Sequence, residues 1–210
     1  MERKEISKQV LKRLPGYLAY LKSMPDGASP YISATALANA LGMGEVQVRK
    51  DLAMVSDGGR PKIGYPRDVL IDDIEQFLGY DNTTDAVLIG AGKLGQALLG
   101  YSGFSAYGLN ILAAFDKNPG IGQTEHGKPI YPIGALENFC RSHMIRMAII
   151  TVPVEHAQEV CDQLISCGIK AIWNFAPTHL EVPANILVQN ENMAMSLALL
   201  SMHLKAQLKK

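Results

Sequence analysis

The chain has 210 residues, of which 48% are hydrophobic and 19% are charged, and its formal net charge is zero. This composition is typical of a soluble globular protein with one large or two small domains. No apolar run approaches the roughly 18 residues of a membrane-spanning helix, and no apolar segment of a signal peptide follows the charged N-terminus. We therefore expect a cytoplasmic protein with no membrane partner.

The charge is unevenly distributed along the chain. Residues 1–67 hold 11 Lys and Arg against 6 Asp and Glu, whereas residues 68–210 hold 9 against 14. A basic N-terminal part predicts a polyanionic partner for that part of the chain alone.

Cysteines and histidines give no metal-binding pattern. Cys140, Cys161 and Cys167 form no C-x-x-C pair, and the five histidines form no H-x-x-x-H or H-E-x-x-H pair. We expect free, buried thiols and no metal site.

A proline interrupts the first helical segment. Residues 5–13 have a helical pattern, but Pro15 would break a longer helix and suits the first position of a second one. We therefore expect two helices, over residues 5–13 and 15–24, followed by a turn at residues 25–27.

The next segment predicts a helix-turn-helix. Ser33 is a typical N-cap and Gly42 a typical helix stop, so we expect one helix between them. A second helix begins near Glu45 and continues to Val55 (EVQVRKDLAMV). Two short helices joined by a glycine-containing turn are typical of this motif, whose second helix enters the major groove of DNA.

Residues 56–66 indicate a tight β-hairpin, or wing, with Gly58-Gly59 as its turn. Basic side chains near its tip can reach phosphates or the minor groove. The alternative is an antiparallel helical domain with a solvated charged face, which the positive charge of the N-terminal part disfavours. The candidate DNA contacts are Gln47, Arg49, Lys50, Arg60, Lys62 and Tyr65.

The segment 90–95 (GAGKLG) carries the strongest motif in the chain. It is a complete G-x-G-x-x-G between a short apolar strand, residues 86–89, and a run of good helix formers, which is the context of a dinucleotide-binding turn. The first glycine allows a tight turn, the second the close approach of a pyrophosphate, and the third close packing of the helix on the strand. The helix N-terminus adds unpaired N–H groups for the phosphates.

An acidic residue follows at the expected distance. Asp116 ends a second apolar strand, residues 111–116, and lies 21 residues after Gly95, close to the ~20 residues of the fingerprint. A carboxylate there accepts both ribose hydroxyls and repels a 2′-phosphate, which favours NAD(H) over NADP(H). The alternative makes the glycines ordinary loop residues and Asp116 part of a surface turn, and it leaves the agreement of strand, spacing and acid unexplained.

Strands and helices alternate over the rest of the chain. This pattern predicts a parallel α/β sheet that binds its ligand at the carboxyl ends of the strands. Residues 151–153 (TVP) and 174–177 (NFAP) follow two such ends and suit the floor of a nicotinamide site, although each is also an ordinary proline-containing turn. The expected elements are helices over residues 132–144 and 155–166 and strands over residues 146–151, 170–175 and 186–189.

The last segment, residues 191–210, predicts a helix that is apolar on more than one face. Such a helix must bury its apolar side chains, and a partner subunit is one place for them.

Together these segments resemble the Rex family of redox-sensing transcriptional repressors, in the family's order and over nearly the whole chain. The resemblance implies a homodimer that exchanges its C-terminal helices, with NADH lowering DNA affinity and NAD+ permitting DNA binding. It also implies operators at genes of fermentation and anaerobic respiration. The segments that carry it are QVRKDL (47–52), GY (64–65), GAGKLG (90–95), YSGF (101–104), FD (115–116), TVP (151–153) and NFAP (174–177).

Two segments depart from the family pattern. Residues 53–59 (AMVSDGG) stand where the family has a repeated Phe-Gly motif, so the resemblance does not extend to the shape of the wing or to the operator that it fits. The family often pairs a tyrosine, here Tyr101, with an aspartate on the partner's exchanged helix, followed by a phenylalanine near the nicotinamide; this chain has Asn192 and Met193.

An amide can bond a tyrosine but carries no charge. We therefore predict altered or weaker discrimination between NADH and NAD+. Unchanged affinities for both nucleotides in an Asn192→Asp variant would argue against this prediction.

The predicted architecture is a winged helix-turn-helix domain (1–80), a Rossmann NAD(H)-binding domain (81–190) and a dimerisation helix (191–210). A helix over residues 68–77 closes the first domain, and the polar residues 79–85 form a linker. The candidate cofactor-binding residues are Gly90, Ala91, Gly92, Lys93, Leu94, Gly95, Tyr101, Asp116, Lys117, Thr151, Val152, Pro153, Asn174, Phe175, Ala176, Pro177, Asn192 and Met193.

The favoured function is a repressor without enzymatic activity that binds operator DNA and responds to NADH and NAD+. One rival is a small NAD-dependent oxidoreductase, but no substrate domain or recognisable acid–base set remains for it. The other is a nucleotide sensor of the coenzyme A type, against which Asp116 argues.

Overall fold

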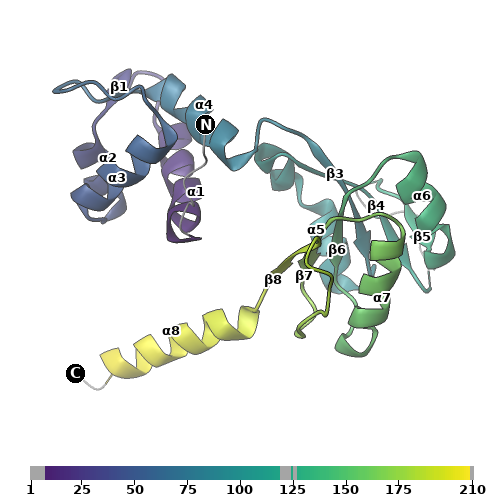
Figure 1. The fold of residues 1–210 in the computed structure, drawn as a ribbon. Helices are drawn as coiled ribbons and strands as arrows, with labels where there is room; N and C mark the ends of the chain where they lie inside the picture. The colour runs from purple at the N-terminus through teal and green to yellow at the C-terminus, as the bar shows by residue number, and fades with distance from the viewer. Residues whose placement is uncertain (1–7, 119–123, 125–126, 209–210) are drawn as a thin grey trace. The chain divides into compact units, whose positions relative to one another are not determined.

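The computed structural model describes residues 8–118, 124 and 127–208. Its internal contacts divide it into two compact units, which meet in sequence between Asn82 and Thr83. Residues 5–7 of the first predicted helix, and the last two lysines, lie outside the described residues. Figure 1 shows an N-terminal unit built mainly of helices and a C-terminal unit built around a sheet.

The N-terminal unit packs four helices and a two-stranded ribbon around one core. Its largest fully buried side chains include those of Leu14, Tyr17, Leu52 and Ile74. The two strands are antiparallel, and Ile32 pairs with Tyr65. The elements are α1 (Lys8–Ser23), β1 (Tyr31–Ile32), α2 (Ala34–Leu41), α3 (Glu45–Val55), β2 (Tyr65–Pro66) and α4 (Arg67–Leu78).

The first two predicted helices are one continuous helix, so the prediction of a break at Pro15 is wrong. A proline inside a helix removes one backbone hydrogen bond and costs about 3 kcal/mol. The helix continues because it is buried on both sides of the proline: Leu14, Tyr17, Leu18 and Leu21 are at most 3% exposed. Tertiary packing therefore outweighs the local preference.

The helix-turn-helix has the predicted caps. The Ser33 hydroxyl accepts a hydrogen bond from the Ala36 N–H at 3.0 Å. Gly42 ends α2 in the left-handed conformation, with φ of 63°. Helix α3 has the predicted bounds, Glu45–Val55. These local signals were sufficient because capping depends on neighbouring residues alone.

The wing is present, but its turn is not at Gly58-Gly59. The turn comprises residues 61–63 and is closed by two backbone hydrogen bonds between Arg60 and Gly64, each 2.9 Å long. Gly59 has a different role: a Cβ there would lie 2.8 Å from the Tyr65 ring. The glycine pair therefore marks a place of close packing beneath the wing. From the sequence alone, a glycine required by close packing looks the same as a glycine required by a turn.

The C-terminal unit is a six-stranded, fully parallel sheet in the order β5-β4-β3-β6-β7-β8. The order reverses between β3 and β6, which is where such sheets bind nucleotides. The strands are β3 (Thr84–Ile89), β4 (Leu109–Asp116), β5 (Ile130–Pro132), β6 (Met147–Ile150), β7 (Ala171–Asn174) and β8 (Leu187–Asn190).

Helices cover the two faces of this sheet (Figure 1). Helices α6 and α7 bury Cys140, Cys161 and Leu164 against one face. Helix α5 and the short 3₁₀ helix after it pack Leu99 and Phe104 against the other face. The helical segments are α5 (Lys93–Gly100), η1 (Ser102–Tyr107), η2 (Ile133–Ala135), α6 (Leu136–Ser142), α7 (Val154–Ser166) and α8 (Met193–Gln207).

Most predicted boundaries in this unit differ by one or two residues, and two of the differences have a clear structural cause. The helix expected over residues 132–144 is shorter, because Pro132 ends β5 and a 3₁₀ turn precedes α6. Strand β3 begins at Thr84, inside the segment expected to be a linker, because Thr84 pairs with Leu109 of β4.

All three cysteines are free thiols; Cys140 and Cys161 are buried as predicted, whereas Cys167 is only partly buried. Burial raises the pKa of Cys140 and of Cys161 to about 11, so both remain protonated at neutral pH. Across the described ranges, no three His, Cys, Asp or Glu side chains gather as a metal site would require. Within those same ranges, every helix is too short or too polar to cross a bilayer.

Candidate nucleotide site and nucleic-acid interface

The three glycines of the G-x-G-x-x-G motif have different surroundings. Gly90 follows β3 with φ of 102°, a conformation that side chains rarely adopt. A Cβ on Gly95 would lie 1.9 Å from the Gly90 carbonyl oxygen, so α5 can approach β3 only because residue 95 is glycine. Gly92 has open space where its Cβ would be. The fold itself therefore does not require a glycine at position 92.

Asp116 lies at the carboxyl end of β4, beside this loop. Its carboxylate accepts hydrogen bonds from the Ala91 N–H at 2.6 Å and from the Asn118 N–H at 2.8 Å. An ionised carboxylate has about four acceptor positions, so two remain for the hydroxyls of a ribose. The hydrogen bond from the Ala91 N–H also holds the glycine loop to Asp116, the acidic residue that the motif spacing associates with this loop.

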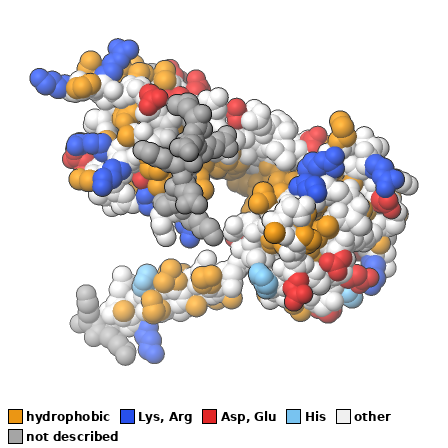
Figure 2. Space-filling view, in the orientation of Figure 1, with side chains coloured by type: hydrophobic (Ala, Val, Ile, Leu, Met, Phe, Trp, Pro, Cys, Tyr) orange, Lys and Arg blue, Asp and Glu red, His pale blue; other side chains and the backbone are white. Residues whose placement is uncertain are grey.

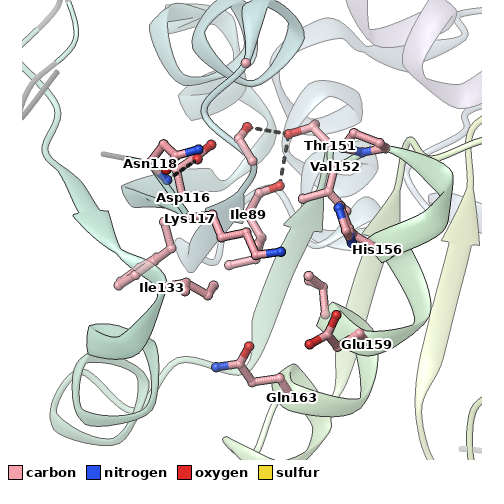
Figure 3. A pocket seen from close by; sticks show the side chains of 15 residues that line it. Ile89, Asp116, Lys117, Asn118, Ile133, Thr151, Val152, His156, Glu159 and Gln163 are labelled. Carbon is pink, nitrogen blue, oxygen red and sulfur yellow. Dashed lines mark hydrogen bonds between the residues drawn. The ribbon is translucent and has the colours of Figure 1, made fainter. Parts of the chain in front are cut away.

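A pocket of about 620 Å³ opens at the carboxyl ends of β3, β4 and β6 (Figure 3). It contains seven of the predicted cofactor-binding residues, from three separate segments of the chain. They are Gly90, Gly92, Asp116, Lys117, Thr151, Val152 and Pro153.

The far wall of the pocket comes from α7 and was not predicted. His156, Glu159, Val160 and Gln163 line it, and their spacing places them on one face of the helix. One feature of the sequence could have indicated this wall. Helix α7 directly follows residues 151–153, so its first turns must lie beside the carboxyl end of β6.

Thr151 connects β6 to the glycine loop. Its hydroxyl lies 2.7 Å from the Gly90 carbonyl oxygen and 3.0 Å from that of Ile89, so its one proton bonds the loop (Figure 3). The hydroxyl oxygen keeps lone pairs that can accept a bond from a ligand.

The Asn174 side chain shapes its own loop. It is fully buried, and its amide nitrogen lies 2.9–3.2 Å from oxygens of Ala176, Thr178 and Asn190. Its amide oxygen accepts from the Ala176 N–H. We infer that Asn174 positions residues 175–178. Ala176 and Pro177 line a separate hollow of about 270 Å³, which Asn192 also borders.

The contacts of Tyr101 and Asn192 are with residues three positions later in the sequence. The Tyr101 side chain is 55% exposed, and its ring lies edge-on to Phe104 at 4.9 Å. The Asn192 side chain caps α8 by accepting from the Met195 N–H at 2.9 Å. The side chain of Met193 lies outside the described residues.

Five of the six predicted DNA contacts are exposed on α3 and the wing, namely Gln47, Arg49, Lys50, Arg60 and Lys62. Arg49 forms an ion pair with Glu45, one turn earlier on α3. The sixth, Tyr65, is buried under the wing with only 9% of its surface exposed, and burial raises its pKa. Tyr65 therefore supports the wing from beneath.

A buried network holds α3 against α1, and sequence reasoning did not identify it. The Arg13 guanidinium donates two hydrogen bonds to the Asp51 carboxylate, at 2.7 and 2.8 Å. The Tyr17 hydroxyl donates a third, at 2.8 Å. This network fixes α3, which carries three of the candidate DNA contacts, Gln47, Arg49 and Lys50.

Lys62 occupies the left-handed conformation at the tip of the wing, with φ of 65°. A non-glycine residue there costs roughly 1–2 kcal/mol. We predict that Lys62→Gly leaves the fold as stable or stabilises it by up to about 1 kcal/mol, because glycine removes the strain but has more freedom when unfolded. The same change should weaken DNA binding and lower its salt slope by about one, because one phosphate contact is lost.

Thermal unfolding and salt-dependent DNA titration measure both effects. Lys62→Arg is the control, since it keeps the charge and the backbone cost. An unchanged salt slope in the glycine variant would mean that the wing tip does not contact DNA.

Known proteins match both units. Residues 5–53 match the family described as "Putative DNA-binding protein N-terminus", and residues 81–178 match the family "CoA binding domain". The redox-sensing transcriptional repressor Rex of Treponema denticola is 42% identical over 191 residues, which cover 90% of this chain and 91% of that protein.

Three solved structures of RSP, described as a Rex-family repressor, have the same fold over nearly the whole chain. The complex of RSP with β-NAD+ and operator DNA matches with a TM-score of 0.89 and 33% identity, covering 97% of this chain and 94% of that one. The complex with β-NADH matches with a TM-score of 0.85 and 32% identity, covering 97% and 96%.

Proposed function

The chain belongs to the Rex family of redox-sensing transcriptional repressors, and we propose that it binds operator DNA and releases it when NADH occupies the glycine-loop pocket. The observation that carries this proposal is the joining, in one chain, of a helix-turn-helix unit to a parallel sheet whose glycine loop is hydrogen-bonded to Asp116. Relatives of this family are named as repressors, which agrees with a role without enzymatic activity. Because operators lie in the bacterial cytoplasm, we place the protein there.

DNA recognition is assigned to α3 and the wing. Exposed Lys and Arg side chains on both elements can neutralise phosphates, which supplies most of the affinity and makes it salt-dependent. Gln47 lies on the exposed part of α3 and can bond base edges.

Nucleotide binding is assigned to the pocket at β3, β4 and β6. The N-terminus of α5 has no side-chain cap, so its N–H groups are available to a pyrophosphate. The remaining acceptor positions of Asp116 suit the ribose diol of the adenosine half. Residues 174–177 and Tyr101 complete the nicotinamide end in this proposal.

A homodimer is proposed from helix α8. Its apolar side chains are more than half exposed in the single chain, and Figure 2 shows them along the helix. Exposure of this extent marks an interface. A groove of about 460 Å³ across β6, β7 and β8, which Trp173 and Leu187 line, is one surface that a partner's helix can cover. The exposed residues are Met195, Leu197, Leu199, Leu200, Met202, Leu204 and Leu208.

We predict that the double variant Leu197→Lys, Leu200→Lys is monomeric at concentrations where the wild-type protein is a dimer. Burying two unpaired charges at an interface costs several kcal/mol, on the order of a 1,000-fold loss in association. Sedimentation velocity measures the state, and Lys205→Gln is the matched polar control on the same helix. A wild-type monomer at micromolar concentration would contradict the dimer proposal.

Operator binding with and without nucleotide tests the function. Fluorescence anisotropy of a palindromic Rex-type operator is measured at fixed salt, alone and with NADH, NAD+ or coenzyme A. Release by NADH and retention with NAD+ are expected. If DNA binds and none of the three changes it, the redox switch is refuted; if only coenzyme A does, the ligand assignment is wrong.

A further inference from the structure

Gln47 is held by the same guanidinium that anchors Asp51. The two residues lie four positions apart on α3, so their side chains share one side of the helix. With its oxygen turned toward α1, the Gln47 amide accepts from Arg13 Nε at 2.9 Å and from Arg13 Nη1 at 3.0 Å. Nη1 takes no part in the pair with Asp51, which uses Nε and Nη2. Arg13 therefore bonds both residues of α3 at once.

The chemistry of Arg13 decides which atom of the Gln47 amide faces it. A guanidinium has five N–H donors and no acceptor, so it bonds the amide oxygen and not the NH2 group. A hydrogen bond from a charged donor is also about twice as strong as one between neutral groups. Gln47 is exposed, whereas only 18% of the Arg13 side chain is. The amide oxygen is thus engaged within the protein, and the NH2 group, across the amide carbon, is left for a ligand.

A glutamine fixed in this way reads DNA differently from a free one. Gln47 is the third residue of α3, and the N-terminal residues of a recognition helix are the ones that contact base edges. A free glutamine binds adenine with both amide atoms, because it accepts from N6 and donates to N7. An amide that only donates cannot form that pair. It suits guanine, whose major-groove edge offers two acceptors, N7 and O6.

We propose that Arg13 is a positioning residue for operator recognition, which holds Gln47 as a donor and so directs it to guanine instead of adenine. This inference rests on the proposed function, because it assigns a class of base to one contact of α3. It gives the guanidinium two roles. Its pair with Asp51 fixes α3 against α1, and its bond to Gln47 sets what that helix reads.

Operator variants locate the base and measure the preference. Each position of a palindromic Rex-type operator is changed, together with its symmetric mate, to each of the four base pairs. Dissociation constants of the full-length protein are measured by fluorescence anisotropy at fixed salt. Gln47→Ala identifies the contacted position, as the position at which the base preference is lost. We expect the wild type to bind guanine there at least about fivefold more tightly than adenine.

A change at Arg13 tests its positioning role through a ratio of affinities. Arg13→Lys keeps a cation for Asp51 but lacks the planar fork that spans Asp51 and Gln47. The freed amide should reverse the preference at that position to adenine, by about fivefold or more. This ratio is independent of a structural loss of folded protein, which weakens binding to both operators equally.

Gln47→Glu gives a second test that leaves Arg13 unchanged. One carboxylate oxygen pairs with Arg13, and the other can only accept a hydrogen bond. The preference at the same position should therefore move from guanine to cytosine, whose edge offers the N4 donor.

The outcomes are distinct. A wild-type preference for any base other than guanine at the Gln47 position would overturn the inference, as would an unchanged guanine preference in Arg13→Lys. Retention of that preference by Gln47→Glu would also overturn it, and this variant decides the question if Arg13→Lys does not fold. Operator binding in which no position depends on Gln47 refutes this inference alone, whereas failure of the wild type to bind the operator at all refutes the proposed function.

Discussion

Gly95→Ala is expected to weaken nucleotide binding strongly and to destabilise the C-terminal unit. The new Cβ would lie 1.9 Å from the Gly90 carbonyl oxygen and 3.0 Å from both Leu88 Cδ2 and Thr151 Oγ1. The first of these is a backbone atom, so the clash can be relieved only by moving α5 or the glycine loop. Overpacking typically costs about 1–3 kcal/mol, and a rigid neighbour places this change at the upper end.

Movement of the loop affects binding more than stability. The Gly90 carbonyl also accepts the Thr151 hydroxyl, and the next N–H in the loop, that of Ala91, bonds Asp116. A shift of Gly90 therefore disturbs the pyrophosphate and ribose positions together. We expect NADH affinity to fall at least 100-fold, or about 3 kcal/mol.

Gly92→Ala separates the two effects. No atom lies within 4 Å of the new Cβ, and the backbone of Gly92, with φ of −68°, suits alanine. Its melting temperature should match the wild type, while NADH affinity falls because the methyl group occupies space meant for phosphate. Thermal unfolding and NADH titration on both variants measure this. Normal NADH binding by Gly95→Ala would show that α5 can move without cost and would refute the argument.

The geometry of the candidate site was predictable where its signals are local. Gly90 and Gly95 each answer a steric demand of the nearby backbone, and Asp116 ends a strand at a fixed spacing. The pocket wall formed by α7 was not predicted, because the position of this helix beside the pocket depends on how it packs against the sheet and not on any local sequence pattern. The hydrogen bond from Ala91 to Asp116 joins residues 25 apart in sequence, and only the pairing of β3 with β4 brings them together.

The errors in the N-terminal unit have the same origin. Pro15 and Gly58-Gly59 are strong local signals, and each is overruled by contacts distant in sequence. Buried side chains hold α1 together on both sides of its proline, and the Tyr65 ring needs the space at Gly59. Asp51 lies in one of the segments that carry the family resemblance, yet the segment itself gives no indication that Arg13 and Tyr17 are its partners.

The phenol in this network makes the N-terminal unit sensitive to alkali. Burial, and then the hydrogen bond to Asp51, raise the pKa of Tyr17 from its ordinary value of 10 to about 12. The folded state therefore favours the neutral phenol. The stability that this contributes is complete below pH 10 and is lost as the pH rises to 12.

Asp51→Asn is expected to loosen α3 from α1 and to abolish operator binding. Asn keeps the shape of Asp51 but has one acceptor oxygen and no charge, so it cannot pair with both nitrogens of Arg13. Breaking a buried ion pair costs about 3–5 kcal/mol. Because 18% of the Arg13 side chain is exposed, water partly compensates, and we expect a loss of about 2–3 kcal/mol.

Hydrogen–deuterium exchange on the full-length protein locates this loss. Peptides from α1 and α3 should exchange at least tenfold faster in Asp51→Asn, since each 1.4 kcal/mol of opening free energy is about a factor of ten. Peptides from β3 and β4, and NADH affinity, should match the wild type. Asp68→Asn is the matched control, because the Asp68 side chain is 88% exposed and its ion pair with Arg67 is long, at 3.5 Å. Equal exchange in the two variants would mean that Asp51 does not anchor α3, and that this helix is held by its apolar face alone.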